Sequence, residues 1–262
     1  MGDIARCSEG KASSLYNAKL LYNLFGVNAE LLIDHAWGWE PTEIADCKAY
    51  TPESKSLSSG QVLSRPYSFD EGRIVIQEMA DGLAMDLVRK RLMTNQVVLD
   101  VGYDTSNLSD PAVMAKYHGA VKADRYGRQV PQRVHGSCNL GRYMSSSERI
   151  MEAVSEIYDK IVDRNLTVRR FNVTVTRLLT VEEAQDEESK KAPEQLSLFR
   201  DYVAEEKAKE EEDAALEKER KMQEALINIR DRFGKNAVVK GLNLQEGATA
   251  IERNGQVGGH KK

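Results

Sequence analysis

Few residues in this sequence have the types and spacing that catalysis or metal binding requires. Asp70 and Glu71 are adjacent carboxylates, and acidic residues close together can hold metal ions. They open a segment whose apolar residues recur at helical spacing. We therefore interpret Asp70 as a helix N-cap and Glu71 as a first-turn acid favoured by the helix dipole. No nucleophile elbow or phosphate-cradling glycine loop is present, and the histidines lack metal-ligand spacing: His35, His118, His135 and His260. We expect no catalytic residue, metal site or cofactor on this chain.

Polar and basic residues alternate with apolar ones in two segments. In residues 166–176 the apolar set is Phe171, Val173 and Val175, and the intervening set is Arg170, Asn172, Thr174 and Thr176. In residues 135–142 the alternation places His135, Ser137 and Asn139 opposite Cys138 and Leu140. A sheet face of small polar and basic side chains suits a phosphate backbone, which needs donors and positive charge. The alternative is an ordinary solvated sheet face.

The predicted strands and helices that would carry these residues follow a recognisable order along the chain. Strands are predicted at 57–63, 96–103, 135–142 and 166–176. One helix follows Asp70, and a second follows the capping sequence Ser145–Glu148. Residues 104–133 are expected to form a long loop. The β-α-β-β-α-β order predicts an α+β, ferredoxin-like domain with two helices on one sheet face and the other face free.

Charge and composition divide the chain into segments, expected at 1–52 (helical), 53–180 (the sheet domain), 181–199 (an acidic linker), 200–233 (a long charged helix) and 234–262 (a flexible Gly- and Lys-rich tail). Within the first, helices are expected to start near Ser14 or Asn17 and at Ala29. A coiled coil in the charged helix is disfavoured, because 205–213 has no apolar seam.

The cellular setting follows from the cysteines and from the absence of targeting signals. Cys7, Cys47 and Cys138 are widely spaced and odd in number, which fits a reducing compartment. No signal peptide or membrane-spanning run is visible. A soluble cytoplasmic protein is expected.

Several stretches resemble Y-family translesion DNA polymerases of the UmuC/DinB-like type, most closely those of low-GC Gram-positive bacteria. Residues 1–5, 24–26 and 36–38 resemble parts of the small thumb domain, and 55–60 resembles the linker into the little-finger domain. Val168-Arg169-Arg170-Phe171-Asn172-Val173 is similar to the last strand of that domain. The resemblance covers almost the whole chain.

The resemblance implies that this domain holds damaged or primer-template duplex DNA through phosphate contacts. Ser58 and Gly60 on the first strand, and Arg169 and Arg170 on the last, become expected contacts. Adjacent residues of a strand point to opposite faces, so both arginines reach one phosphate only through a twist or bulge. Arg170 is the stronger candidate, because it shares the face of Asn172 and Thr174. The polar residues His135, Ser137 and Asn139 complete the predicted DNA-binding set.

Gln195-Leu196-Ser197-Leu198-Phe199 resembles the peptide with which bacterial proteins bind the sliding clamp, the DNA polymerase III β subunit. Leu198 and Phe199 would fill an apolar clamp pocket, and the Gln195 amide would satisfy polar groups at its rim. Leu196 is the fourth expected contact. The alternative is the hydrophobic first turn of the following helix.

The family's catalytic carboxylates lie in a palm that would precede Met1, and Mg²⁺ is expected only there. Ser68–Glu71 spells the family's S-x-D-E element, and Val98–Val101 resembles the sequence that should follow it, but an expected helix separates the two. We expect a non-catalytic DNA-binding and clamp-docking portion of a translesion polymerase acting in DNA repair and the SOS response. The alternative is the C-terminal half of a split DNA-directed DNA polymerase, active only with a separate palm-bearing chain.

Overall fold

The computed structural model describes residues 1–50, 55–124, 126–190, 202–257 and 260–261. The chain divides into two compact units, Met1–Glu53 and Ser54–Lys262. The expected clamp-binding residues Gln195–Phe199 lie outside the described residues. No helix in the described ranges is long and apolar enough to cross a membrane.

The first unit contains α1 (Gly2–Ser8), α2 (Ala18–Phe25) and α3 (Asn28–Ala36), which pack together, followed by α4 (Ile44–Ala49). The Asn17 side chain caps α2 by accepting a hydrogen bond from the Leu20 amide at 3.2 Å, and Gly26 ends the helix at a φ of 58°. The sequence predicted α2 and α3, and α1 and α4 are additional. Cys7, Leu21 and Ala29 form the unit's small core.

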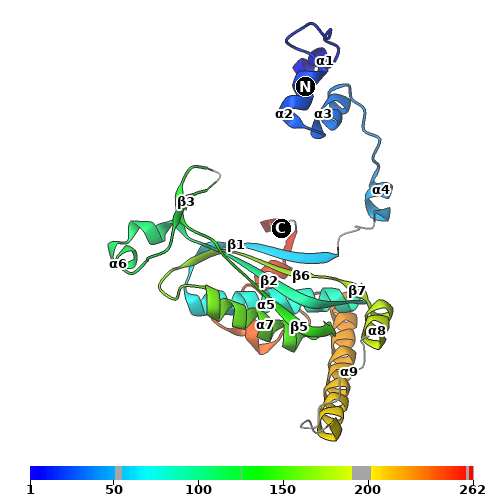
Figure 1. Ribbon diagram of the computed structural model, residues 1–262, viewed down its shortest axis with the longest axis vertical. Coiled ribbons are helices and arrows are strands. Elements are labelled where there is room, and N and C mark those ends of the chain that lie inside the picture. Colours follow the sequence, from blue (N-terminus) through cyan, green and yellow to red (C-terminus); the bar gives the residue numbers. More distant parts are fainter. Residues whose placement is uncertain (51–54, 125, 191–201, 258–259, 262) are drawn as a thin grey trace. The chain divides into compact units, whose positions relative to one another are not determined.

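The second unit is built on an antiparallel sheet in the order β1 (Ser56–Tyr67), β6 (Val168–Thr176), β2 (Leu92–Tyr103) and β5 (Val134–Met144). The helices α5 (Phe69–Arg89) and α7 (Ser147–Ile161) cover one face (Figure 1). Each βαβ unit is split by a strand of the other, because β6 lies between β1 and β2, and β2 lies between β6 and β5. The predicted α+β class is confirmed. A short strand, β7 (Leu179–Thr180), pairs with the start of β2.

The core between the sheet and the two helices follows from strand and helix periodicity. The inward residues of β2 and β6 are fully buried: Val97, Leu99, Val101, Phe171, Val173 and Val175. Ile76 and Leu87 of α5 and Val154 of α7 are also fully buried against them. Burying such side chains stabilises the fold by about 1.5–3 kcal/mol each. Neither α5 nor α7 covers the opposite face of the sheet (Figure 1).

The start of α5 corrects one prediction. Ser68, not Asp70, is the N-cap, and its hydroxyl accepts a hydrogen bond from the Glu71 amide at 3.3 Å. The Glu71 carboxylate accepts in return from the Ser68 amide, which completes a capping box. Glu71 also forms an ion pair with Arg65, and this hydrogen-bonded guanidinium lowers the pKa of Glu71 to about 2.

The expected 104–133 loop is instead structured. It contains a 3₁₀ turn, η1 (Thr105–Ser109), a short helix, α6 (Pro111–Met114), and a hairpin of β3 (Val121–Ala123) and β4 (Gln129–Pro131). The Asp124 carboxylate accepts hydrogen bonds from the Tyr126 and Arg128 amides at 2.8 and 3.0 Å, which fixes the hairpin turn. The polar composition concealed these elements because each is very short.

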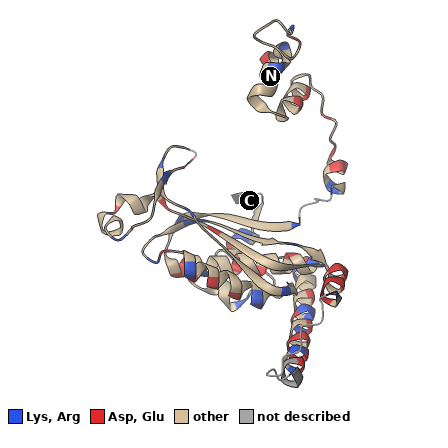
Figure 2. Ribbon diagram, viewed as in Figure 1, with Lys and Arg blue, Asp and Glu red and all other residues tan. Residues whose placement is uncertain are grey.

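Residues 181–189, expected within a linker, form the helix α8 (Val181–Ser189). Its N-terminus has a capping box between Thr180 and Glu183. Figure 2 shows that acidic residues make up much of the ribbon of this helix. The long charged helix is α9 (Tyr202–Phe233), along which acidic and basic residues are interleaved (Figure 2).

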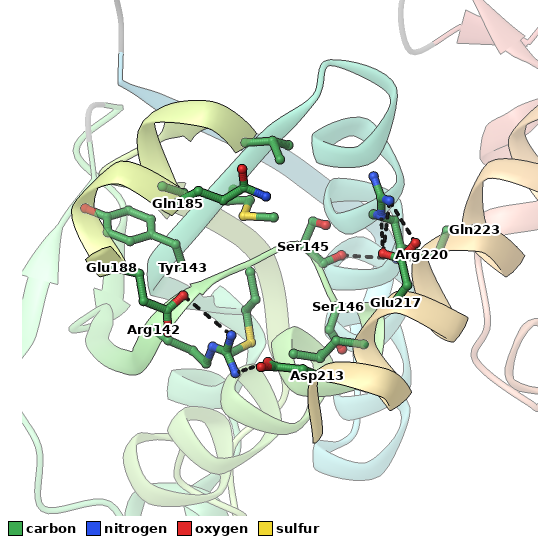
Figure 3. Close-up of a pocket in the computed structure, with 15 residues that line it drawn as sticks. Arg142, Tyr143, Ser145, Ser146, Gln185, Glu188, Asp213, Glu217, Arg220 and Gln223 are labelled. Atoms are coloured by element: carbon green, nitrogen blue, oxygen red, sulfur yellow. Dashed lines mark hydrogen bonds and ion pairs between the residues drawn. The ribbon is translucent and has the colours of Figure 1, made fainter. Parts of the chain in front are cut away.

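Arg142 at the end of β5 joins these two helices. Its guanidinium lies 3.6 Å from Glu188 of α8 and 2.7 Å from Asp213 of α9 (Figure 3). A cavity of about 310 Å³ lies at this junction. The Gln223 amide of α9 donates to the Ser145 carbonyl at 3.1 Å, whereas Nε of Arg142 is buried without a hydrogen-bond partner.

The tail is not free, contrary to the prediction of a flexible segment. It contains η2 (Gly241–Leu244), α10 (Ala250–Asn254), β8 (Gln256–Val257) and β9 (His260–Lys261). Glu78 of α5, whose side chain is buried, accepts hydrogen bonds from the amides of Thr249 and Ala250 at 2.7 and 3.0 Å. Lys240 pairs with Asp81 of α5 at 2.7 Å. Polar anchors, rather than a core of its own, hold the tail on α5.

Candidate nucleic-acid interface

The open face of the sheet gathers the polar residues that the alternation predicted. In the strand register Gly60, Asn172 and His135 fall in one row across β1, β6, β2 and β5, with Asp100 of β2 between the last two. The next row contains Ser58, Thr174 and Ser137. His135, Ser137 and Asn139 are exposed, and Cys138 and Leu140 pack against the core.

Asp100 is a feature of this face that the sequence analysis missed. Its carboxylate lies 2.7 Å from Nδ1 of His135. The alternation of β2 contained the signal, because Val97, Leu99 and Val101 point inward and Asp100 must point outward. An acid here would repel phosphate, and its contact with the imidazole offsets that repulsion when His135 is protonated.

A bulge in β6 changes the position of the two arginines. Arg170 pairs with Gly102 of β2, and Val168 pairs with the next residue, Tyr103. β6 therefore advances by two residues while β2 advances by one, which leaves Arg169 as the extra residue. Val168 and Phe171 both face the core. The bulge thus frees Arg169 and Arg170 from pointing to opposite faces.

Both arginines line a cavity of about 760 Å³ between this end of the sheet and the β3–β4 hairpin, which we call the hairpin groove. The hairpin lies on the side of the sheet away from α5 and α7 (Figure 1). The other basic residues of the groove are Lys122, Arg128 and Arg133, none of which the sequence analysis singled out. Gly102 forms part of the floor, and a Cβ there would lie 3.4 Å from Cβ of Arg170.

The groove is positively charged overall because its lining has more basic than acidic residues, and both acids are paired with arginines. Arg169 lies 3.7 Å from Asp104, and Arg128 lies 2.7 Å from Asp124. The hydrogen bond from Arg128 lowers the pKa of Asp124, which therefore stays ionised. Within the described part of the chain, Lys122, Arg133 and Arg170 make no ion pair. These three cations are available to an anionic ligand.

The residues singled out from the sequence thus fall into four groups. Ser58, Gly60, His135, Ser137, Asn139, Asn172 and Thr174 lie on the open sheet face, and Arg169 and Arg170 lie at the groove. The clamp-peptide residues lie outside the described ranges. Asp70 and Glu71 are on the far side, at the start of α5, and Glu71 is engaged by Ser68 and Arg65.

The family comparison agrees with the sheet and its helices. Residues 54–198 match the model of the impB/mucB/samB family C-terminal domain, which is more than half of the chain. The chain therefore belongs to this family and carries the C-terminal, little-finger domain of UmuC-like Y-family DNA polymerases, which are enzymes.

Among solved structures, the chain is similar to one described as a complex of the beta-clamp processivity factor and the little finger domain of PolIV. The two are 10% identical, with a TM-score of 0.31, over 55% of this chain and 99% of that one. No curated protein matches the chain significantly.

Proposed function

We propose that the chain binds primer-template or damaged duplex DNA and docks on the sliding clamp, as the C-terminal portion of a cytoplasmic translesion polymerase acting in DNA repair and the SOS response. The observation that carries the DNA-binding part is the β6 bulge, which places Arg169 and Arg170 together at one end of an open polar sheet face. Family membership supports the same assignment.

The contacts would be of the kind that DNA backbones accept. Arg133 and Arg170 have no acidic partner among the described residues, and a guanidinium can engage two phosphate oxygens at once. Asn172 and Ser137 would supply neutral donors on the same open face of the sheet. Binding would depend little on base sequence, because phosphate contacts position a protein on the duplex and do not read it.

The test is a salt titration of DNA affinity by fluorescence anisotropy with a primer-template duplex. Affinity should fall linearly with salt on a log–log plot, with a slope of about −0.9 for each phosphate contact. Arg170→Ala should weaken binding to all sequences alike and reduce that slope by about 1.

Arg73→Ala is the matched control, because Arg73 lies on α5, on the helical side of the sheet, and pairs with Asp159 of α7 at 3.2 Å. It should leave both affinity and slope unchanged. Affinity that is insensitive to salt, or an equal loss in the two variants, would exclude this face as the DNA-binding surface.

Clamp docking rests on the resemblance of Gln195–Phe199 to the clamp-binding peptide. Immobilised sliding clamp should capture the full chain, and Leu198→Ala with Phe199→Ala should abolish capture because the apolar pocket loses both anchors. Ser197→Ala, at the motif's variable position, is the control and should retain it. Capture that survives loss of both anchors would refute the assignment.

Polymerisation would require carboxylates from a palm carried by another part of the protein or by a separate chain, as in a split polymerase. Glu71 supports this proposal, since its carboxylate is already engaged by Ser68 and Arg65. In the described ranges, no cluster of three or more His, Cys, Asp or Glu side chains could hold a metal ion. Purified chain should not extend a primer with dNTPs and Mg²⁺, and robust extension would show that Asp70 and Glu71 had been misassigned.

A further inference from the structure

The strand β1 lies at the edge of the sheet and carries two of the expected DNA contacts, Ser58 and Gly60. One side of β1 pairs with β6, and among the described strands none pairs with its other side. The regular pairing with β6 ends at Val62, where the register shifts before Tyr67. Because an edge strand has backbone hydrogen bonds on one side only, its position depends on whatever else holds it.

The C-terminal tail supplies such a contact through the side chain of Gln61. By strand alternation Gln61 points to the helix-covered face of the sheet, the face of the buried Leu63, and away from the open face. There its amide nitrogen donates to the Thr249 hydroxyl at 3.0 Å, and its carbonyl oxygen accepts from the Arg253 guanidinium at 3.0 Å. Both ends of the Gln61 amide are therefore bonded to the tail.

Thr249 connects this contact to α5. The Glu78 carboxylate of α5 accepts hydrogen bonds from the Thr249 amide at 2.7 Å and from the Thr249 hydroxyl at 3.2 Å. A chain of hydrogen bonds thus runs from α5 through the tail to the edge strand. We call these residues the tail clasp: Gln61, Glu78, Thr249 and Arg253.

The guanidinium of Arg253 serves this clasp rather than the open sheet face. Burial lowers the pKa of Arg253, because desolvation disfavours the charged form. Its hydrogen bond goes to Gln61, and within the described ranges it forms no ion pair. A substitution of Arg253 therefore changes the support of β1 without removing a cation from the proposed DNA-binding surface.

We propose that the tail clasp positions β1 for DNA binding, with Gln61 and Arg253 as positioning residues. The clasp fixes the edge strand to α5 and so keeps Ser58 and Gly60 in line with Thr174 and Asn172, their partners on β6. When the clasp opens, β1 is held by β6 alone and its phosphate contacts weaken. The inference rests on the proposed DNA-binding function and makes that function depend on a tail contact on the other side of the strand.

The experiment measures the affinity of the full chain for a primer-template duplex across a salt titration, in Gln61→Ala and in Arg253→Ala. Each variant should bind about 2-fold to 13-fold more weakly, the factor that corresponds to one lost uncharged hydrogen bond. The salt slope should stay that of the native chain, because no phosphate-neutralising cation is removed. The double variant should lose no more than either single variant, since both changes open the same clasp. Arg253→Lys keeps a donor for Gln61 and should retain most of the affinity.

Ser59→Ala is the matched control, because Ser59 alternates with Gly60 and so points to the same side of β1 as Gln61. It should bind DNA as the native chain does, and urea unfolding should show that every variant is folded. Native affinity in both Gln61→Ala and Arg253→Ala overturns the clasp while the proposed function survives. A slope reduced by about 1 in Arg253→Ala also overturns it, because Arg253 would then contact phosphate directly. Absence of salt-dependent binding by the native chain overturns the clasp together with the proposed function.

Discussion

Replacing Glu78 by glutamine should release the C-terminal tail from α5 while leaving the sheet intact. The Glu78 carboxylate accepts from the Thr249 and Ala250 amides, from the Thr249 hydroxyl at 3.2 Å, and from the Asn243 amide at 2.8 Å. Glu78→Gln keeps the shape of the side chain and removes its charge. The glutamine amide nitrogen cannot accept a hydrogen bond. The groups that donate to one of the two carboxylate oxygens therefore lose their acceptor.

The magnitude follows from these contacts. Hydrogen bonds to a charged group contribute about 1.5–3 kcal/mol each, against about 0.5–1.5 kcal/mol for neutral ones, and an unsatisfied buried donor costs about 1–3 kcal/mol. The tail is partly exposed and water can replace some of the loss, so we expect a net loss of about 2–4 kcal/mol. Since about 1.4 kcal/mol is a factor of ten, opening of the tail should become roughly 30- to 700-fold more frequent.

Native-state hydrogen exchange measures this opening directly. The amides of Thr249, Ala250 and Arg253 should exchange faster by that factor in Glu78→Gln, while those of β2 and β6 keep their protection. Glu156→Gln, the same change at an exposed site on α7, is the control and should leave the tail protected. Unchanged tail exchange in Glu78→Gln, or equal acceleration in the sheet, would refute Glu78 as the tail's anchor.

Three further substitutions test the core and the start of α5. Glu71→Gln should lower the free energy of unfolding at pH 7. Because Arg65 depresses the folded pKa of Glu71 from 4.5 to about 2, the difference should fade as pH falls from about 4.5 to 2, and a pH-independent difference in urea titrations would contradict this. Phe171→Ala should lower the free energy of unfolding by about 3–5 kcal/mol in the same assay, since Phe171 is fully buried. A loss below about 1 kcal/mol would show that neighbouring side chains move in to fill the space left by the ring. Gly72→Ala should cost about 1–3 kcal/mol, because the new Cβ would lie 2.5 Å from the Tyr158 hydroxyl oxygen; a neutral effect would mean that Tyr158 moves aside.

The strand alternation could be predicted from the sequence because it depends only on local periodicity. Phe171, Val173 and Val175 are buried, and Arg170 and Asn172 face the open side, as the pattern indicated. The bulge at Arg169 could not be predicted in this way. It depends on the register of β6 against both neighbouring strands, which is a non-local property.

Other features were missed although a signal existed. Ser68 and Glu71 have the spacing of a capping box, which should have been preferred to Asp70 as the start of α5. The docked tail had no such signal. Its polar composition is typical of a segment without a core, and Glu78 reads as one more surface acid of a helix. The role of Glu78 as an anchor becomes visible only in the folded structure, where the tail packs on α5.

The bulge in β6 also bears on how this surface can change in evolution. Deleting the codon for Arg169 would leave Val168 and Phe171 facing the core and Arg170 facing outward, because the remaining residues would then alternate regularly. Loss or gain of one codon at this position could therefore remove or add a positive charge without a register slip in the rest of the strand. The number of cations on the face could vary among related proteins while the core sequence stays the same.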